Sequence, residues 1–241
     1  MIEIKQLTME FDGRTVLEDI NATFEEGKCN LIIGRSGAGK TVLLKCLIGL
    51  LTPTRGSIYY NGTDVPGLPP KELKAFRTQM GVLFQGSALF DTMNVYENVL
   101  FPLQMFSRLP FSAKKKRARE LLDRVGLADA GRKKIAEISG GMKKRAAIAR
   151  ALALEPKFLF CDEPNSGLDP QTSQSIDDLL YSLTKEQGIT TVINTHDMNS
   201  VRGIGDNILY LLDGNVAWRG SMAQLSEPDL PDSLKSFLLY H

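Results

Sequence analysis

The 241 residues are enough for one large α/β domain or two small ones, and 43% hydrophobic with 24% charged residues is ordinary for a globular protein. With 29 basic and 28 acidic residues the net charge is +1, which gives no overall attraction to nucleic acid. No signal-peptide pattern opens the chain and no apolar run reaches the length of a membrane span, so we expect a cytosolic protein with at most peripheral membrane contact.

The first third of the chain predicts strands around a glycine-rich loop. Alternating apolar and polar side chains indicate short antiparallel strands over residues 1–25, with a turn at Asp12-Gly13. The apolar run Cys29–Ile33 predicts a buried strand and residues 42–49 predict a helix. Between them stand Gly34, Arg35, Ser36, Gly37, Ala38, Gly39, Lys40 and Thr41.

This order of strand, G-x-x-x-x-G-K-[ST] and helix is the expected context of a phosphate-binding loop. Glycines let the backbone curl with its N–H groups pointing inward around a phosphate, and the helix N-terminus adds partial positive charge. Lys40 can reach the β- and γ-phosphates of a nucleotide, and the Thr41 hydroxyl can ligate Mg²⁺.

The middle of the chain predicts a short strand, a short helix and then a helical block. Residues 57–62 indicate a hairpin-like strand, Pro69–Glu72 opens a short helix, and residues 81–85 indicate another strand. From residue 86 to 157 the apolar spacing is helical, with Ser112 as the expected N-cap of a helix that runs to Val125 and closes at Gly126. We expect this block to be inserted between two strands of a sheet.

After residue 157 strand-like runs alternate with helices, which favours a parallel sheet. Strands are expected at 158–161, 190–194 and 208–212, and a helix near 171–185. The apolar spacing of 232–240 predicts a short helix that packs on its own chain or on a second copy. The three cysteines lie in apolar runs without a C-x-x-C motif, so we expect core thiols in a reducing compartment: Cys29, Cys46 and Cys161.

Two further motifs carry chemistry. Asp162 and Glu163 end an apolar strand, where the first carboxylate can hold Mg²⁺ and the second can polarise an attacking water. Ser139-Gly140-Gly141 precedes a helix and forms a second anion site at its N-terminus. Taken alone, the latter motif favours a plain helix cap.

The order of motifs along the whole chain resembles that of ATP-binding-cassette (ABC) ATPases. Gln85 follows a strand, Gly167-Leu168-Asp169 comes just after Glu163, and His196 ends the strand at 190–194. The resemblance implies a phosphate-loop (RecA-like) α/β core over 1–241, with a small antiparallel β subdomain and a helical subdomain at about 86–157. It also implies that the cofactors are ATP and Mg²⁺.

The resemblance also implies a role for each matching residue. Phe11 would stack on adenine, and Ser139, Gly140, Gly141 and Asp169 would face the ATP of a second subunit. Glu163 would be the general base and His196 the γ-phosphate sensor. Thr41, Asp162 and Gln85 would hold the metal, and Gln85 would link it to the transmembrane partner.

A closer resemblance is to the ATPases of Mce-associated lipid transporters, of which the Mla phospholipid system (MlaF type) is the best-known case. It rests on residues 83–91, on residues 95–99 and on Met142, where most ABC ATPases have Gln. It implies a homodimer at the cytoplasmic side of the inner membrane that powers phospholipid transport between two membranes. The implied partners are an integral-membrane permease, an Mce-type lipid-binding protein and a small cytoplasmic accessory subunit.

Three other interpretations stay open. One is an ABC importer or exporter for another small solute, and only residues 85–99 and Met142 distinguish it from the lipid transporter. A soluble ABC protein acting on DNA or ribosomes would be expected to carry two cassettes or a long coiled-coil insertion, which this chain lacks. Ser139-Gly140-Gly141 argues against a phosphate-loop switch protein outside the ABC family.

Overall fold

Two β-sheets organise the part of the chain that the computed structural model describes, residues 1–65, 67–227 and 229–240. The first sheet is antiparallel, with order β2-β1-β4-β5, and contains β1 (Ile2–Phe11), β2 (Arg14–Phe24), β4 (Arg55–Tyr60) and β5 (Thr63–Asp64). The second has order β10-β9-β3-β8-β7-β6 and contains β3 (Cys29–Ile33), β6 (Met80–Leu83), β7 (Phe158–Asp162), β8 (Thr190–Thr195), β9 (Asn207–Leu212) and β10 (Asn215–Ser221).

The second sheet is parallel from β6 to β9, and only its edge strand β10 runs antiparallel, to β9. The carboxyl ends of β3, β6, β7 and β8 therefore meet at one edge. In open α/β sheets this is the edge where ligands bind. The α/β fold class expected from the sequence is confirmed.

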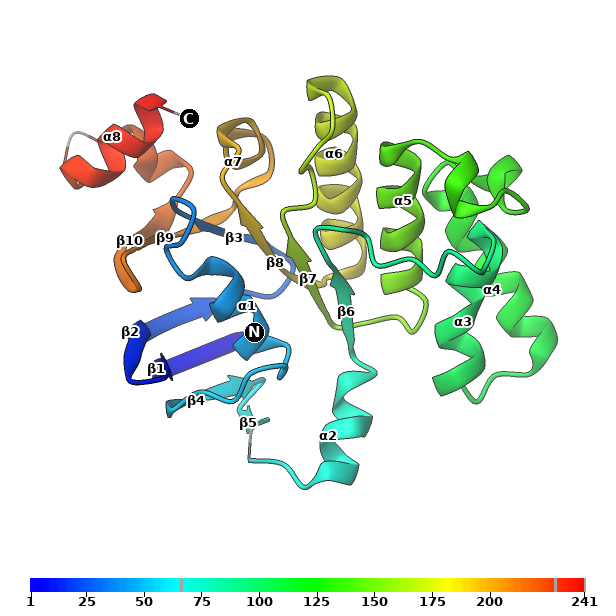
Figure 1. The fold of residues 1–241 in the computed structure, drawn as a ribbon, viewed down its shortest axis with the longest axis horizontal. Helices are drawn as coiled ribbons and strands as arrows, with labels where there is room; N and C mark the ends of the chain where they lie inside the picture. Colours follow the sequence, from blue (N-terminus) through cyan, green and yellow to red (C-terminus); the bar gives the residue numbers. More distant parts are fainter. Residues whose placement is uncertain (66, 228, 241) are drawn as a thin grey trace.

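Helices surround the parallel sheet, and Figure 1 shows α3 and α4 at the opposite end of the molecule from α8. The helices are α1 (Lys40–Leu47), α2 (Pro70–Arg77), α3 (Val95–Phe106), α4 (Phe111–Arg124), α5 (Gly140–Ala151), α6 (Pro170–Gln187), α7 (Met198–Ile204) and α8 (Asp232–Tyr240). Short 3₁₀ turns lie at Ala128–Ala130, Ile135–Glu137 and Ala223–Ser226. Helices α3, α4 and α5 lie between β6 and β7 in the chain.

The two faces of β3 belong to different cores. Leu31 and Ile33 pack with helices α3 to α7, whereas Ile32 packs with the antiparallel sheet and α1. Because both faces are covered, every residue of β3 is buried, which explains the continuous apolar run.

Tyr60 joins the antiparallel sheet to α1. Its fully buried hydroxyl donates a hydrogen bond to the carbonyl of Leu47, the last residue of α1. Its ring packs edge-on against Phe76 of α2 and Phe158 of β7, with centroid distances of 5.2 and 4.9 Å. The hydrogen bond from the Tyr60 hydroxyl satisfies one of the carbonyl groups at the C-terminus of α1 that have no partner within the helix.

The structure corrects one helix boundary and settles the position of α8. Ser112 is not an N-cap, because α4 already begins at Phe111 after Pro110, whose φ of −57° suits a helix start. Strand β10 was not predicted. Helix α8 packs on its own chain, because Leu234 and Phe237 are fully buried and the Phe237 ring lies 5.4 Å from the ring of Tyr210.

Two expectations from composition agree with the described residues. The three cysteines are buried free thiols. Among residues 1–65, 67–227 and 229–240, no helix has the length and apolar character needed to cross a bilayer.

Candidate active site

The glycine-rich loop between β3 and α1 is held in a tight curl. Gly39 precedes α1 with φ of 101°, a left-handed conformation that glycine adopts without strain. A Cβ at this position would lie 2.7 Å from Leu17 Cδ2 and 3.3 Å from the Val16 carbonyl oxygen. The loop can therefore approach the β2 backbone this closely only because residue 39 has no side chain.

Lys40 lies within this curl. Its ammonium donates hydrogen bonds to the carbonyls of Gly34 at 2.8 Å and Arg35 at 3.1 Å, and only 6% of the residue is exposed. Burial lowers the Lys40 pKa, against the opposing effect of Glu163 and Asp162. The loop thus holds a cation beside inward-turned backbone, an arrangement that suits a polyphosphate.

The residues expected to hold Mg²⁺ fit a hard divalent cation. Thr41 Oγ1 lies 3.2 Å from Asp162 Oδ1, and Asn194 Nδ2 donates to the same oxygen at 3.0 Å. These are oxygen ligands, and Mg²⁺ bound with a nucleotide usually takes one or two protein oxygens beside phosphates and waters. Among the described residues no group of three or more His, Cys, Asp or Glu side chains could hold a metal by itself.

Glu163 lies between two polar side chains from neighbouring strand ends. Gln85 Nε2 donates to Glu163 Oε2 at 3.2 Å and to Ser166 Oγ at 3.1 Å. His196 Nδ1 lies 3.1 Å from Glu163 Oε1. The Glu163 side chain is 22% exposed and that of His196 is 54% exposed, so water reaches both. Sequence order predicted these three residues, and the sheet brings them together.

Two polar side chains that the sequence analysis missed support this cluster. Lys144 of α5 is 4% exposed, and its ammonium donates to the carbonyls of Gln85 at 2.5 Å and Glu163 at 3.5 Å. Burial lowers the Lys144 pKa. In the sequence Lys144 looks like part of a solvated basic run, so no local signal marked it. Asn194 carried a weak signal, since it is a polar residue inside an apolar strand.

The residues expected to face a second subunit gather at two adjacent helix N-termini. Ser139 caps α5 by accepting a hydrogen bond from the Met142 N–H at 3.3 Å, and Asp169 caps α6 through the Thr172 N–H at 2.9 Å. A Cβ on Gly141 would lie 2.6 Å from Thr172 Cγ2, so the two helix starts touch there.

These helix starts are separate from the phosphate loop. In the described part of the chain, no hydrogen bond joins Ser139, Gly140 or Gly141 to residues 34–41. Phe11 ends β1 beside the turn at Asp12-Gly13 and is 40% exposed, so its ring face is accessible.

Comparisons with known proteins agree with this geometry. Residues 17–166 match the model of the ABC transporter family. The chain is 41% identical over 230 residues to the probable ribonucleotide transport ATP-binding protein mkl of Mycobacterium leprae, covering 95% of this chain and 66% of the relative. It is 40% identical over 225 residues to the methionine import ATP-binding protein MetN of Clostridium acetobutylicum, covering 93% and 70%. The chain thus spans only about two thirds of the length of these relatives.

Solved structures show the same fold. A dimeric ATP-binding cassette in a post-hydrolysis state, bound to ADP and Pi, is 33% identical with a TM-score of 0.83, covering 92% of this chain and 99% of that one. The protein cbiO1 from Clostridium perfringens, part of an ABC transporter complex, is 33% identical with a TM-score of 0.87, covering 93% and 89%. The chain therefore belongs to the ABC transporter family.

Proposed function

We propose that the chain powers a membrane transporter for a small solute, by hydrolysing ATP at the edge of its parallel sheet. The observation that carries the hydrolytic part is the cluster of Gln85, Glu163 and His196 beside the phosphate loop. The printed names of the relatives, ribonucleotide transport and methionine import, favour a small solute as the cargo.

Phospholipid transport, the main interpretation from the sequence, is our second candidate. Its support is limited to residues 83–91, residues 95–99 and Met142, and the names of the relatives do not mention lipid or an Mce-type partner. An Mce-type lipid-binding protein and a small accessory subunit belong to this second candidate only.

In the hydrolytic step we assign Glu163 as general base. Each of its oxygens faces one neighbour, Gln85 or His196, and keeps a further lone pair that can accept the proton of an attacking water. Lys40 and the backbone of residues 34–41 bind the phosphates. The Phe11 ring stacks on the adenine of the nucleotide. Mg²⁺, held by Thr41 and Asp162 with Gln85 nearby, would neutralise charge on the phosphates when bound.

We propose that two copies of the chain share each site. Ser139, Gly140, Gly141 and Asp169 lie at helix N-termini, which favour anions. A domain that binds one nucleotide at its phosphate loop does not need a second anion site, so we assign these residues to the ATP of the partner subunit. The solved cassette with ADP and Pi is itself dimeric, which supports this arrangement.

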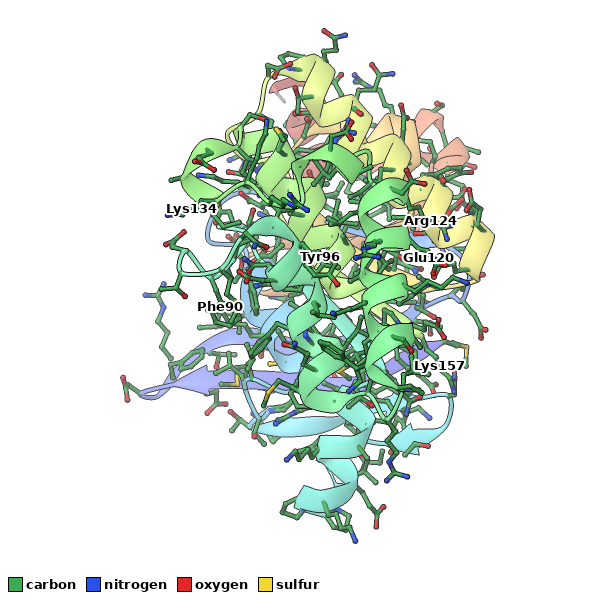
Figure 2. The ribbon with its side chains drawn as sticks, turned by 90° about the vertical axis from the view of Figure 1, so that its right-hand side faces the viewer. Phe90, Tyr96, Glu120, Arg124, Lys134 and Lys157 are labelled. Carbon is green, nitrogen blue, oxygen red and sulfur yellow. The ribbon has the colours of Figure 1, made fainter. Side chains whose placement is uncertain are left out.

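We also propose that an integral-membrane permease docks beside Gln85, at the helical subdomain of residues 86–157, and holds the chain at the cytoplasmic side of the inner membrane. Residues 86–108 hold many large apolar side chains, of which Val95, Val99, Leu100 and Leu103 are buried in the subdomain's own core. The exposed apolar side chains that remain between 86 and 108 are Phe90, Met105 and Phe106, at 43%, 60% and 49%. Figure 2 views this face, with Phe90 near one edge.

Purification of the native complex followed by mass spectrometry of its cargo tests the proposed function. We expect a permease to co-purify, together with a small solute whose uptake into proteoliposomes requires ATP. The same complex carrying Glu163→Gln serves as the control for ATP dependence. A bound phospholipid would favour the second candidate, and cargo movement that persists without ATP hydrolysis would contradict both.

A further inference from the structure

We propose that Asn165 is a positioning residue for ATP hydrolysis, because its amide ties the segment that carries Glu163 to the helix that follows His196. This inference rests on the proposed roles of Glu163 and His196. Asn165 lies two residues after Glu163, in the loop between β7 and α6. Its Nδ2 donates hydrogen bonds to Asp177 Oδ1 at 2.8 Å and to Ser200 Oγ at 3.0 Å.

The two acceptors belong to different helices. Asp177 lies on α6 and is 5% exposed, whereas Ser200 lies on α7 and is 1% exposed. Helix α7 begins at Met198, directly after the cap residue Asp197 and two residues after His196. One partly buried amide therefore connects the loop that carries Glu163 to the helix that follows His196.

The same loop is also fixed from its other side. Ser166, next to Asn165, accepts a hydrogen bond from Gln85 Nε2 at 3.1 Å, and Gln85 donates to Glu163 as well. Glu163 has a φ of 46°, a left-handed backbone conformation that a non-glycine residue holds only when its surroundings impose it. Asn165 supplies part of those surroundings.

The chemistry of the amide explains why asparagine suits this position. Its two N–H donors match two acceptors, whereas a threonine hydroxyl has one donor and could serve only one of them. The Asn165 Oδ1 atom is buried and has no hydrogen-bond partner among the described residues. The donations to Asp177 and Ser200 therefore account for the orientation of the side chain.

The test is a double-mutant cycle in steady-state ATPase activity. Asn165→Ala removes both donations, and Ser200→Ala removes only the acceptor on α7. Small displacements of a catalytic group cost up to about a hundredfold in rate, so we expect Asn165→Ala to lower kcat by roughly tenfold to a hundredfold while KM for ATP stays within about twofold. Ser200→Ala should lower kcat in the same direction, and the double variant should be no slower than Asn165→Ala alone, because both act through one contact.

Asn199→Ala is the matched control, since Asn199 is exposed on the same helix and its side chain makes no hydrogen bond among the described residues. Thermal unfolding of every variant shows that the rate is compared between folded proteins. A parallel change in KM and kcat, or additive effects of the two alanines, would overturn the proposal in favour of a structural role. Glu163→Gln, measured alongside, separates a failure of the proposed function from a failure of the proposed role of Asn165. Normal turnover there contradicts the proposed function, whereas a slow Glu163→Gln with unaltered Asn165→Ala and Ser200→Ala contradicts only the role of Asn165.

Discussion

Gln85 donates a hydrogen bond to Glu163 over 3.2 Å, although the two residues lie 78 positions apart in the chain. The parallel register of β6 and β7 pairs Leu83 with Cys161, so the residues two positions further along each strand also meet. Gln85 precedes the segment that leads to α3. A change at the Glu163 carboxylate is therefore one hydrogen bond away from the start of the helical subdomain.

The role of Glu163 as general base gives the first prediction. Loss of general-base positioning typically costs about 10²–10⁴ in rate, so Glu163→Gln should bind Mg-ATP, turn it over very slowly and accumulate as an ATP-bound dimer. Phosphate release and size-exclusion chromatography with ATP measure both effects. Glu120→Gln, on the exposed part of α4, is the control and should retain full activity. Near-normal turnover of Glu163→Gln would remove Glu163 from this role.

The proposal that two copies share each ATP site predicts two unequal sites in a dimer of two different variants. A Lys40→Ala chain combined with a Ser139→Arg chain should form one intact site and one site with both lesions. Lys40→Ala weakens nucleotide binding because it removes a buried positive charge from the phosphates. Equilibrium binding of labelled ATP counts tight sites per dimer, and we expect one. Two equally weakened sites would show that each site is confined to a single chain.

Docking of a permease beside Gln85 predicts that charge at the exposed edge of the helical subdomain breaks the complex. Leu89→Glu and Phe90→Glu should release the permease, because a carboxylate in an apolar interface loses hydration without gaining a partner. The isolated Phe90→Glu subunit should stay folded and bind ATP, since Phe90 is 43% exposed. Leu89 packs partly against the core, so thermal unfolding of Leu89→Glu shows whether that variant is compared as a folded protein. Leu50→Glu, at a leucine that is 60% exposed after α1, is the matched control. Retention of the permease in both docking variants would place the interface elsewhere.

Asp177 predicts a specific dependence of stability on pH. Burial, with smaller contributions from the Asp197 and Asp178 carboxylates, raises the pKa of its carboxyl from an ordinary value of 3.8 to about 6, although hydrogen bonds with Ser200 and Asn165 act to lower it. The folded state therefore binds this proton more tightly than the unfolded state, so its contribution is present below about pH 4 and is lost as pH rises through 6. A shift of this size corresponds to about 3 kcal/mol.

Asp177→Asn removes this titration while keeping an oxygen that can accept the Asn165 hydrogen bond. Relative to the unchanged protein, we expect the variant to gain stability toward unfolding by urea between pH 4 and pH 8. The contributions of the carboxyl groups that both proteins share cancel in the difference between their free energies of unfolding. Asp123→Asn, on the exposed surface of α4, is the matched control for the loss of one carboxylate. A difference for Asp177→Asn that does not vary with pH would contradict the raised pKa of Asp177.

Local sequence patterns were sufficient for most of the strands and helices. The buried strands β3 and β7 are mainly apolar, β8 has an apolar centre, and the spacing of its glycines and lysine identifies the phosphate loop. The start of α4 was missed by two residues, because Ser112 offered a stronger capping signal than Pro110. Strand β10 was missed because its residues do not alternate between apolar and polar and none of them is fully buried.

Contacts across the sheet could not be predicted in the same way. Lys144 reaches the carbonyls of Gln85 and Glu163 only because α5 packs against the strand ends, and its own neighbours in sequence are basic. The exposed apolar side chains within residues 86–108 could not be predicted for the same reason, since the sequence does not show which face of α3 the other helices cover. Exposure is a property of packing rather than of composition.

The bond from the Tyr60 hydroxyl to the Leu47 carbonyl limits where the molecule can bend. This hydrogen bond connects the antiparallel sheet to the end of α1. The rings of Phe76 on α2 and Phe158 on β7 pack against the Tyr60 ring. A hinge between the antiparallel sheet and α1 would have to break this hydrogen bond and these ring contacts, and would expose the buried Tyr60 hydroxyl. We therefore expect the antiparallel sheet and α1 to move together, and any large movement of helices α3 to α5 to take place at the connecting segments 84–94 and 152–157.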